Sequence, residues 1–227
     1  MKSIVDDFKK VAIAIQPYVD LAGGSGNGEP EINYNKICFN GCEKCGHPKE
    51  DHGIAWPSDD AGGVANPFKE NVEKGSWFGG VELQKRTCGG NCSHETMLFE
   101  RIKTLEKWDE PKENGLYFEF CKTAFKPYDL AVIALLIIAK HYLKDKVRVS
   151  SDGTDEQWFD GKMLCQQELG YGLDFNLKIQ ELIDERNNCR KSKDFKRADE
   201  IKNELEKQGI IIEDSKDETI YYRRNKI

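Results

Sequence analysis

Two short cysteine clusters constrain the fold of this chain more than any other feature of its sequence. Five of the eight cysteines and three of the four histidines lie within residues 31–98. Glycine and proline interrupt this region, and few of its segments have the period of a helix or a strand. Because such a region buries little apolar surface through regular elements, we expect a bound metal ion to contribute to its stability.

The spacing of the two clusters is typical of zinc knuckles. Cys42 and Cys45 form a C-x-x-C pair, and Cys88 and Cys92 form a C-x-x-x-C pair. Zinc takes four nitrogen or sulfur ligands in a tetrahedron, and a tight turn brings two such ligands to one ion. We therefore predict a structural Zn²⁺ site with these four cysteines as ligands. The alternative ligands, as replacements or in a second site, are Cys38, His47, His52 and His94.

Other interpretations of the clusters stay open at this stage. The cysteines could be free thiols in a reducing cytosol, or the C-x-x-C pair a redox centre, although no strand-to-helix pattern flanks it. A catalytic zinc would keep an open coordination position beside a carboxylate base. Its extra ligand would be His52 or His94, and its base Glu50, Asp51 or Glu95. The spacing of a zinc-dependent nucleobase deaminase is absent, and we assign no catalytic residue.

The whole sequence predicts an α+β protein. We expect an irregular zinc-stapled region, a small α/β core around a buried helix, and a C-terminal helical hairpin followed by a β-hairpin. The expected divisions are a helix at 1–22, a Gly-rich linker at 23–30, the Cys/His-rich region at 31–98, the core at 99–175 and a C-terminal part at 176–227.

The apolar segment 129–143 predicts the central element of the core. Its residues are apolar on nearly all sides, so we expect a buried helix with Asp129 as its N-cap. Around it we predict a short helix at 98–108, strands at 116–120 and 147–150, and a helix from 154 to 169.

Charge and hydropathy limit the class of protein. The net charge is −6, which argues against coating nucleic acid by charge alone. Residues 184–227 carry a net +1, however, within an otherwise acidic chain. The longest apolar run, Leu130–Ala139, is half of the roughly twenty residues that a membrane helix needs. With no secretory signal at the start, we expect a cytoplasmic protein without a membrane partner.

The C-terminal residues follow an ordered series of motifs. Lys193-Asp194-Phe195 precedes Ala198-Asp199, then Gly209-Ile210-Ile211-Ile212-Glu213-Asp214, Thr219 and Arg223-Arg224. The apolar spacing of Phe195, Ala198, Ile201 and Leu205 predicts one helix, which Ser192 could cap. Over residues 178–224 this order resembles the C-terminal extension of bacterial cysteinyl-tRNA synthetases.

The resemblance implies a small module that contacts the anticodon end of tRNA. Basic side chains contact phosphates and aromatic rings stack on unpaired bases in such complexes. The class I synthetase signatures His-Ile-Gly-His and Lys-Met-Ser-Lys-Ser have no counterpart, so we do not expect synthetase activity. Carried over by position, the RNA-binding candidates are Arg186, Arg190, Lys193, Arg197, Lys202, Tyr221, Tyr222, Arg223 and Arg224.

Three functional hypotheses follow from the sequence. The first is a non-catalytic zinc-binding protein whose C-terminal part binds tRNA or another structured RNA. The second is an interaction or assembly protein that uses the same part to dock on a protein partner, because its basic residues alternate with acids that could neutralise them. The third is a zinc-dependent hydrolase.

Overall fold

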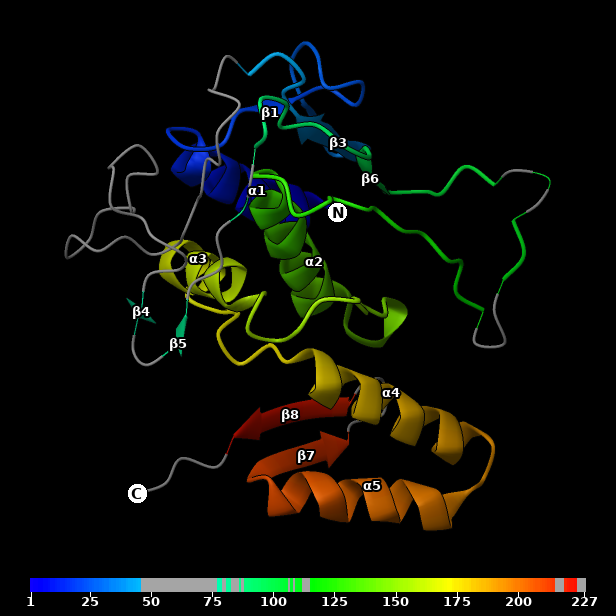
Figure 1. Cartoon of the computed structure of the whole chain (residues 1–227). Coiled ribbons are helices and arrows are strands. Elements are labelled where there is room, and N and C mark those ends of the chain that lie inside the picture. The colour runs from blue at the N-terminus through cyan, green and yellow to red at the C-terminus, as the bar shows by residue number, and fades with distance from the viewer. Residues whose placement is uncertain are drawn as a thin grey trace.

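The computed structural model is an α+β fold, as the sequence predicts (Figure 1). The structure describes residues 1–45, 77–78, 81–82, 86, 88–105, 107, 109–111, 115–214 and 219–223. Its helices are α1 (Lys2–Ile15), α2 (Asp129–Leu143), the 3-10 helix η1 (Lys144–Lys146), α3 (Phe159–Leu169), α4 (Leu177–Lys191) and α5 (Phe195–Lys207). Its strands are β1 (Leu21–Ala22), β2 (Glu31–Ile32), β3 (Lys36–Gly41), β4 (Trp77–Phe78), β5 (Val81–Glu82), β6 (Met97–Glu100), β7 (Ile210–Asp214) and β8 (Thr219–Arg223).

Helix α2 is the centre of the larger core. Its apolar residues are buried on nearly every side, as the continuous apolar run predicts. Helices α1 and α3 pack against it, and residues from α1 through Leu177 form one hydrophobic cluster. The carboxylate of Asp7 on α1 accepts hydrogen bonds from the hydroxyls of Tyr142 (2.6 Å) and Tyr171 (2.9 Å). The first helix is therefore docked on the core.

Strand β3 carries the cysteine region onto this core. It pairs antiparallel with β1, β2 and β6, with Ile37 opposite Phe99 of β6. Phe39 of β3 stacks on Phe8 of α1 at 5.2 Å between ring centroids and meets the ring of Tyr128 edge-on at 6.5 Å. The end of β3 is thus held rigidly against the two helices, directly before the first cysteine pair.

Several expected elements differ from the observed ones. Residues 97–100 pair with β3 as a strand where we expected the start of a helix, because pairing with a neighbouring strand overrides weak local preference. Residues 116–120 and 147–150, where we expected strands, pair with no strand among the described residues. Asp129 is the first residue of α2 rather than its N-cap, and its carboxylate binds Arg86 and Thr123 instead.

The helices α4 and α5 and the strands β7 and β8 form a separate small core, which we call the C-terminal module. Ile183, Ile201, Leu205 and Ile210 are at its centre. The helix caps are Asn176, whose side chain accepts from the Ile179 amide, and Asp194, whose side chain accepts from the Arg197 amide. Ser192, the cap expected from the sequence, instead ends α4. The expected helical hairpin and β-hairpin are both present, at the opposite end of the molecule from β3 in Figure 1.

In the described part of the chain, no helix combines the length and the apolar content that crossing a bilayer requires.

Candidate metal centre and nucleic-acid interface

Three of the four predicted zinc ligands lie together in the structure. The Sγ of Cys88 is 3.3 Å from that of Cys45 and 3.2 Å from that of Cys92, and the three sulfurs lie within 4.8 Å of one another. None of the three is in a disulfide. Of the cysteine, histidine, aspartate and glutamate side chains that the structure describes, these three cysteines form the one group close enough together to hold a metal ion.

The backbone around the cysteines explains why they meet. The Cys92 amide donates to the Cys42 carbonyl at 3.0 Å, which locks the second knuckle onto the first. Gly41 lies so close to this contact that a Cβ there would be 1.9 Å from the Cys92 carbonyl oxygen. Gly89 and Gly90 adopt φ of +62° and +81°, which glycine allows at little steric cost. These glycines let the two turns approach closely.

The chemistry of the three thiols fits a divalent metal. Burial raises the pKa of the Cys88 and Cys92 thiols, so without a cation they are uncharged at neutral pH. A metal ion reverses this preference because it binds the thiolate form. Zinc–sulfur bonds of about 2.3 Å in a tetrahedron imply sulfur separations of about 3.8 Å. The observed 3.2 and 3.3 Å require only small outward shifts to reach that arrangement.

The other candidate ligands divide into three groups. Cys42 contributes its carbonyl to the knuckle, but its sulfur is not among the three clustered ones. The Nδ1 of His94 lies 2.7 Å from the Lys122 carbonyl oxygen, and neither His94 nor Cys38 joins the cluster. His47 and His52 lie outside the described residues, as do Glu50 and Asp51.

Two of the predicted RNA-binding arginines are committed to contacts within the C-terminal module. Arg186 is 5% exposed, and its guanidinium donates to both carboxylate oxygens of Asp214, at 2.9 and 2.6 Å. Arg190 reaches the same carboxylate at 2.8 Å. Together they hold the pKa of Asp214 down, to about 2, with the Arg186 hydrogen bonds as the main cause. Both arginines therefore fasten α4 to the end of β7.

Other candidates also have partners inside the module. Arg197 pairs with Glu185 at 2.8 Å, and Lys202 lies 3.8 Å from Glu206. The hydroxyl of Tyr221 accepts from the Gln180 side chain at 2.5 Å, so this ring faces inward rather than toward solvent. The side chains of Tyr222 and Arg223, and the whole of Arg224, lie outside what the structure describes.

The turn between α4 and α5 presents a different surface. Lys191, Lys193 and Lys196 are exposed there, and within the described part of the chain none of them takes part in an ion pair. Phe195 lies among them with 59% of its surface exposed. The apolar spacing predicts Phe195 on the buried stripe of its helix, and Lys191 and Lys196 are not among the RNA-binding candidates that the resemblance implies. Only Ala198, Ile201 and Leu205 of that stripe are buried.

Lys193 has an unusual backbone at this turn. Its φ is +65°, in the left-handed region that normally favours glycine. Its amide donates to the Arg190 carbonyl, and the next amide, of Asp194, donates to the Cys189 carbonyl. This is a Schellman cap with lysine in the glycine position. A charged side chain thus occupies the position at a conformational cost. We call Lys191, Lys193, Phe195 and Lys196 the turn patch.

Comparisons with known proteins agree with the geometry of the module. The family model of the cysteinyl-tRNA ligase anticodon binding domain matches residues 174–223. The resemblance of the C-terminal part is thereby confirmed. The cysteine–tRNA ligase of Finegoldia magna is 48% identical over 144 residues, 60% of this chain and 28% of that protein. That of Staphylococcus saprophyticus is 58% identical over 128 residues, 52% of this chain and 25% of that protein.

The likeness covers only part of these relatives. The cysteine–tRNA ligase of Limosilactobacillus reuteri is 59% identical over 44 residues, 19% of this chain and 9% of that protein. The chain thus spans between 9% and 28% of the length of these curated relatives. No solved structure gives a significant match to the chain.

Proposed function

We propose that this protein binds structured RNA, of the tRNA class, through the turn patch of its C-terminal module, and that it does so without catalysis. The observation that carries the proposal is the exposed Phe195 between lysines that have no acidic partner in the described part of the chain. The match of the module to an anticodon binding domain supports the choice of RNA.

The chemistry of the patch suits an RNA loop. Single-stranded loops expose unstacked bases, which stack on aromatic side chains, while lysines contact the adjoining phosphates. Asp194 lies within the patch, but its carboxylate is occupied as the cap of α5 by the Arg197 amide at 3.1 Å. The arginines of the module then have a supporting role. Arg186 and Arg190 hold α4 against the end of β7 through Asp214, and Arg197 holds α5 against α4 through Glu185.

The test is binding of the full chain to total tRNA over a series of salt concentrations. Changing Lys191, Lys193 and Lys196 together to Gln should weaken binding and reduce the slope of log affinity against log salt by about 2, since three phosphate contacts are lost. Phe195→Leu should weaken binding by about tenfold through lost stacking, with little change in that slope. The two variants therefore separate the charge contribution from the aromatic one.

A matched control keeps the change in net charge constant. Lys2 and Lys9 of α1 and Lys146 of η1 are exposed and lie outside the C-terminal module. Changing these three to Gln removes the same total charge far along the chain from the turn patch, and binding should stay within about twofold of the natural protein. Equal losses in the two triple variants, or no binding at low salt, would contradict the proposal.

We further propose that Cys45, Cys88 and Cys92 bind a structural zinc ion, with Cys42 as the fourth ligand. Four protein ligands would close the coordination sphere, as in structural rather than catalytic sites. The clustering of the half-buried Cys45 thiol with the buried thiols of Cys88 and Cys92 supports the site, and a reducing compartment such as the cytoplasm would keep them available. The metal would hold the two knuckles together.

Metal analysis tests this second part. The purified protein should contain about one zinc per chain, and Cys88→Ser should lose it together with part of the cooperative unfolding transition. Cys42→Ser should weaken zinc binding far more than Cys38→Ser, which serves as the matched control. Full zinc retention in Cys42→Ser would exclude Cys42 as the fourth ligand.

Protein docking is the second candidate function. The ion pairs of Arg186, Arg190 and Arg197 favour it, because charges satisfied within the module contribute little to binding phosphate. In that case the turn patch would contact an acidic protein surface, and tRNA would not bind at any salt concentration.

A further inference from the structure

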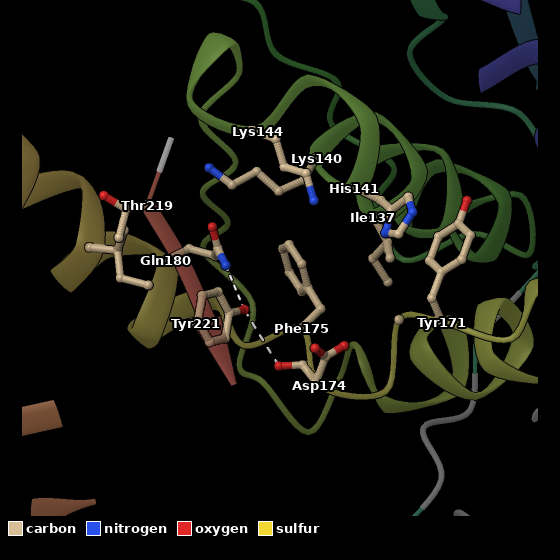
Figure 2. A pocket seen from close by; sticks show the side chains of 12 residues that line it. Ile137, Lys140, His141, Lys144, Tyr171, Asp174, Phe175, Gln180, Thr219 and Tyr221 are labelled. Atoms are coloured by element: carbon tan, nitrogen blue, oxygen red, sulfur yellow. Dashed lines mark hydrogen bonds between the residues drawn. The ribbon is translucent and has the colours of Figure 1, made fainter. Parts of the chain in front are cut away.

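A pocket lies where the larger core meets the C-terminal module. Its volume is about 120 Å³. The end of α2 provides Ile137, Lys140 and His141, and the first residue of η1 provides Lys144. The loop after α3 provides Tyr171, Asp174 and Phe175. Helix α4 and strand β8 complete the wall with Gln180 and Tyr221 (Figure 2). The pocket therefore joins segments that are far apart in the sequence.

The pocket has an apolar floor and a polar rim. Ile137 and Phe175 are 2% and 6% exposed and form part of the floor. In Figure 2 the two lysines and His141 lie on one side of the space, and Gln180, Tyr221 and Asp174 lie on the opposite sides. This arrangement is typical of small-ligand sites, in which a few polar groups orient a molecule above apolar surface.

The polar groups of the rim are held in place before any ligand binds. The Nζ of Lys140 donates to the Val147 carbonyl at 3.1 Å, and Gln180 donates to the Tyr221 hydroxyl at 2.5 Å. The imidazole of His141 stacks on the Tyr171 ring at 3.7 Å between centroids and 10° between planes. Preorganised groups bind a small ligand better because less conformational freedom is lost on binding.

The charges around the pocket favour an anion. Asp184 lies 3.9 Å from Lys140 and 3.6 Å from Arg148, so these two cations share one carboxylate. Lys144 and Asp174 on the rim add one charge of each sign. The charged residues that line the pocket, Lys140, Lys144 and Asp174, therefore carry an excess of one positive charge. Partial burial, and then the nearby Lys144, lower the pKa of His141.

Lys144 provides the strongest evidence for a ligand, through its backbone conformation and its lack of an ion pair among the described residues. Its φ of +52° and ψ of −122° belong to a conformation that glycine adopts readily and lysine rarely does. Within the described part of the chain its amino group makes no ion pair. Strained backbone that carries a functional side chain is typical of ligand sites, where the surrounding structure holds it.

We infer that the junction pocket binds a small oxyanion of the phosphate class, with Lys144 and Lys140 as its cationic contacts. A ligand there contacts α2 on one side and the C-terminal module on the other, so its binding stabilises the junction between them. This site is independent of the proposed RNA surface, which lies at the turn between α4 and α5.

The test is thermal unfolding of the full chain in inorganic phosphate, against sodium chloride at equal ionic strength. Phosphate should raise the melting temperature saturably, because a ligand that binds only the folded state stabilises it. Lys144→Gly should melt at a higher temperature than the natural protein without phosphate, since glycine suits the backbone, and should lose the phosphate shift. Lys144→Gln should lose the shift as well, whereas Lys146→Gln, on the exposed side of η1, should keep it.

Asp174→Asn provides a further test, because it should change the phosphate shift in the opposite direction to the lysine substitutions. Removing this carboxylate from the rim should increase the phosphate shift, because it takes away a repulsive charge. A phosphate shift no larger than the chloride shift, or an unchanged phosphate shift in Lys144→Gly, would overturn the inference, and so would a smaller shift in Asp174→Asn.

Discussion

The larger core and the C-terminal module handle buried charge in opposite ways. In the core, Arg86 is completely buried and binds Asp129 at 2.9 Å and Asp160 through both of its terminal nitrogens. In the module, Arg186 is 5% exposed, but the carboxylate it binds, Asp214, stands at the surface. Arg86 is buried together with both of its carboxylate partners, whereas the buried Arg186 pairs with a carboxylate that is exposed to solvent.

The difference shows what each ion pair does for stability. Arg86 joins segments that are far apart in sequence, and its two carboxylates are themselves buried, so no partner can return to water without unfolding. The Asp214 pairs join the end of β7 to α4, and solvent screens them partly. We therefore expect large effects of charge substitutions in the core and small, pH-dependent effects in the module.

The largest expected effect tests the core. Arg86→Met should lower the free energy of unfolding by about 3–5 kcal/mol, because two buried carboxylates lose their cation. Burial raises the pKa of Asp160 even with Arg86 present. A carboxyl with a raised pKa in the folded state gains stability as pH falls, so the variant should recover stability from pH 7 toward pH 4. Chemical denaturation at several pH values measures both effects.

Arg148→Met provides the matched control for this substitution. Arg148 is exposed at the junction, 3.6 Å from Asp184, so its loss should change the free energy of unfolding by less than about 1 kcal/mol. Equal losses in the free energy of unfolding for Arg86→Met and Arg148→Met would contradict the expectation that buried ion pairs matter more for stability than exposed ones.

The second prediction concerns the knuckle beside the core. Gly41→Ala should destabilise the protein by about 3 kcal/mol, because the new Cβ meets the Cys92 carbonyl and the backbone must move. Gly28→Ala is the comparison, since its φ is +69° but nothing lies within 4 Å of the added carbon. It should cost only about 1 kcal/mol of conformational strain. A similar cost at both positions would show that the close approach of Cys92 is unimportant.

The third prediction tests the surface pairs of the module. Because the pKa of Asp214 is lowered to about 2, its contribution to stability is complete above pH 4 and disappears as pH falls toward 2. After allowance for solvent screening, we expect a loss of about 1 kcal/mol over this interval. Asp214→Asn should abolish that part of the pH dependence, whereas Glu181→Gln on the exposed face of α4 should retain it.

The smallest predicted effect on stability concerns the α4–α5 turn. Lys193→Gly should raise the free energy of unfolding by about 0.5–1 kcal/mol, because glycine accepts a φ of +65° without strain. The same change should weaken tRNA binding if the turn patch is the RNA surface. Lys196→Gly, which removes a lysine from within α5, is the control: it should also weaken binding but should destabilise the helix by about 1 kcal/mol.

Local sequence patterns were sufficient for part of this structure. The continuous apolar run predicts the buried helix α2, and the C-terminal segment predicts the helical hairpin and the β-hairpin that α4, α5, β7 and β8 form. The C-x-x-C and C-x-x-x-C spacing identifies three thiols that do lie together. These features are set by neighbouring residues, whose side-chain period and backbone preferences act over a few positions.

Tertiary structure decided which polar side chains remain available for function. The sequence marks Arg186 and Lys193 as equivalent basic residues, yet one is buried against Asp214 and the other is exposed at a turn. It marks Phe195 as part of an apolar stripe, although 59% of this residue's surface is exposed. No sequence motif singles out Arg86. Its role as the buried cation between Asp129 and Asp160 is evident only from the tertiary structure. Burial and ion pairing depend on contacts between remote segments, which local spacing does not specify.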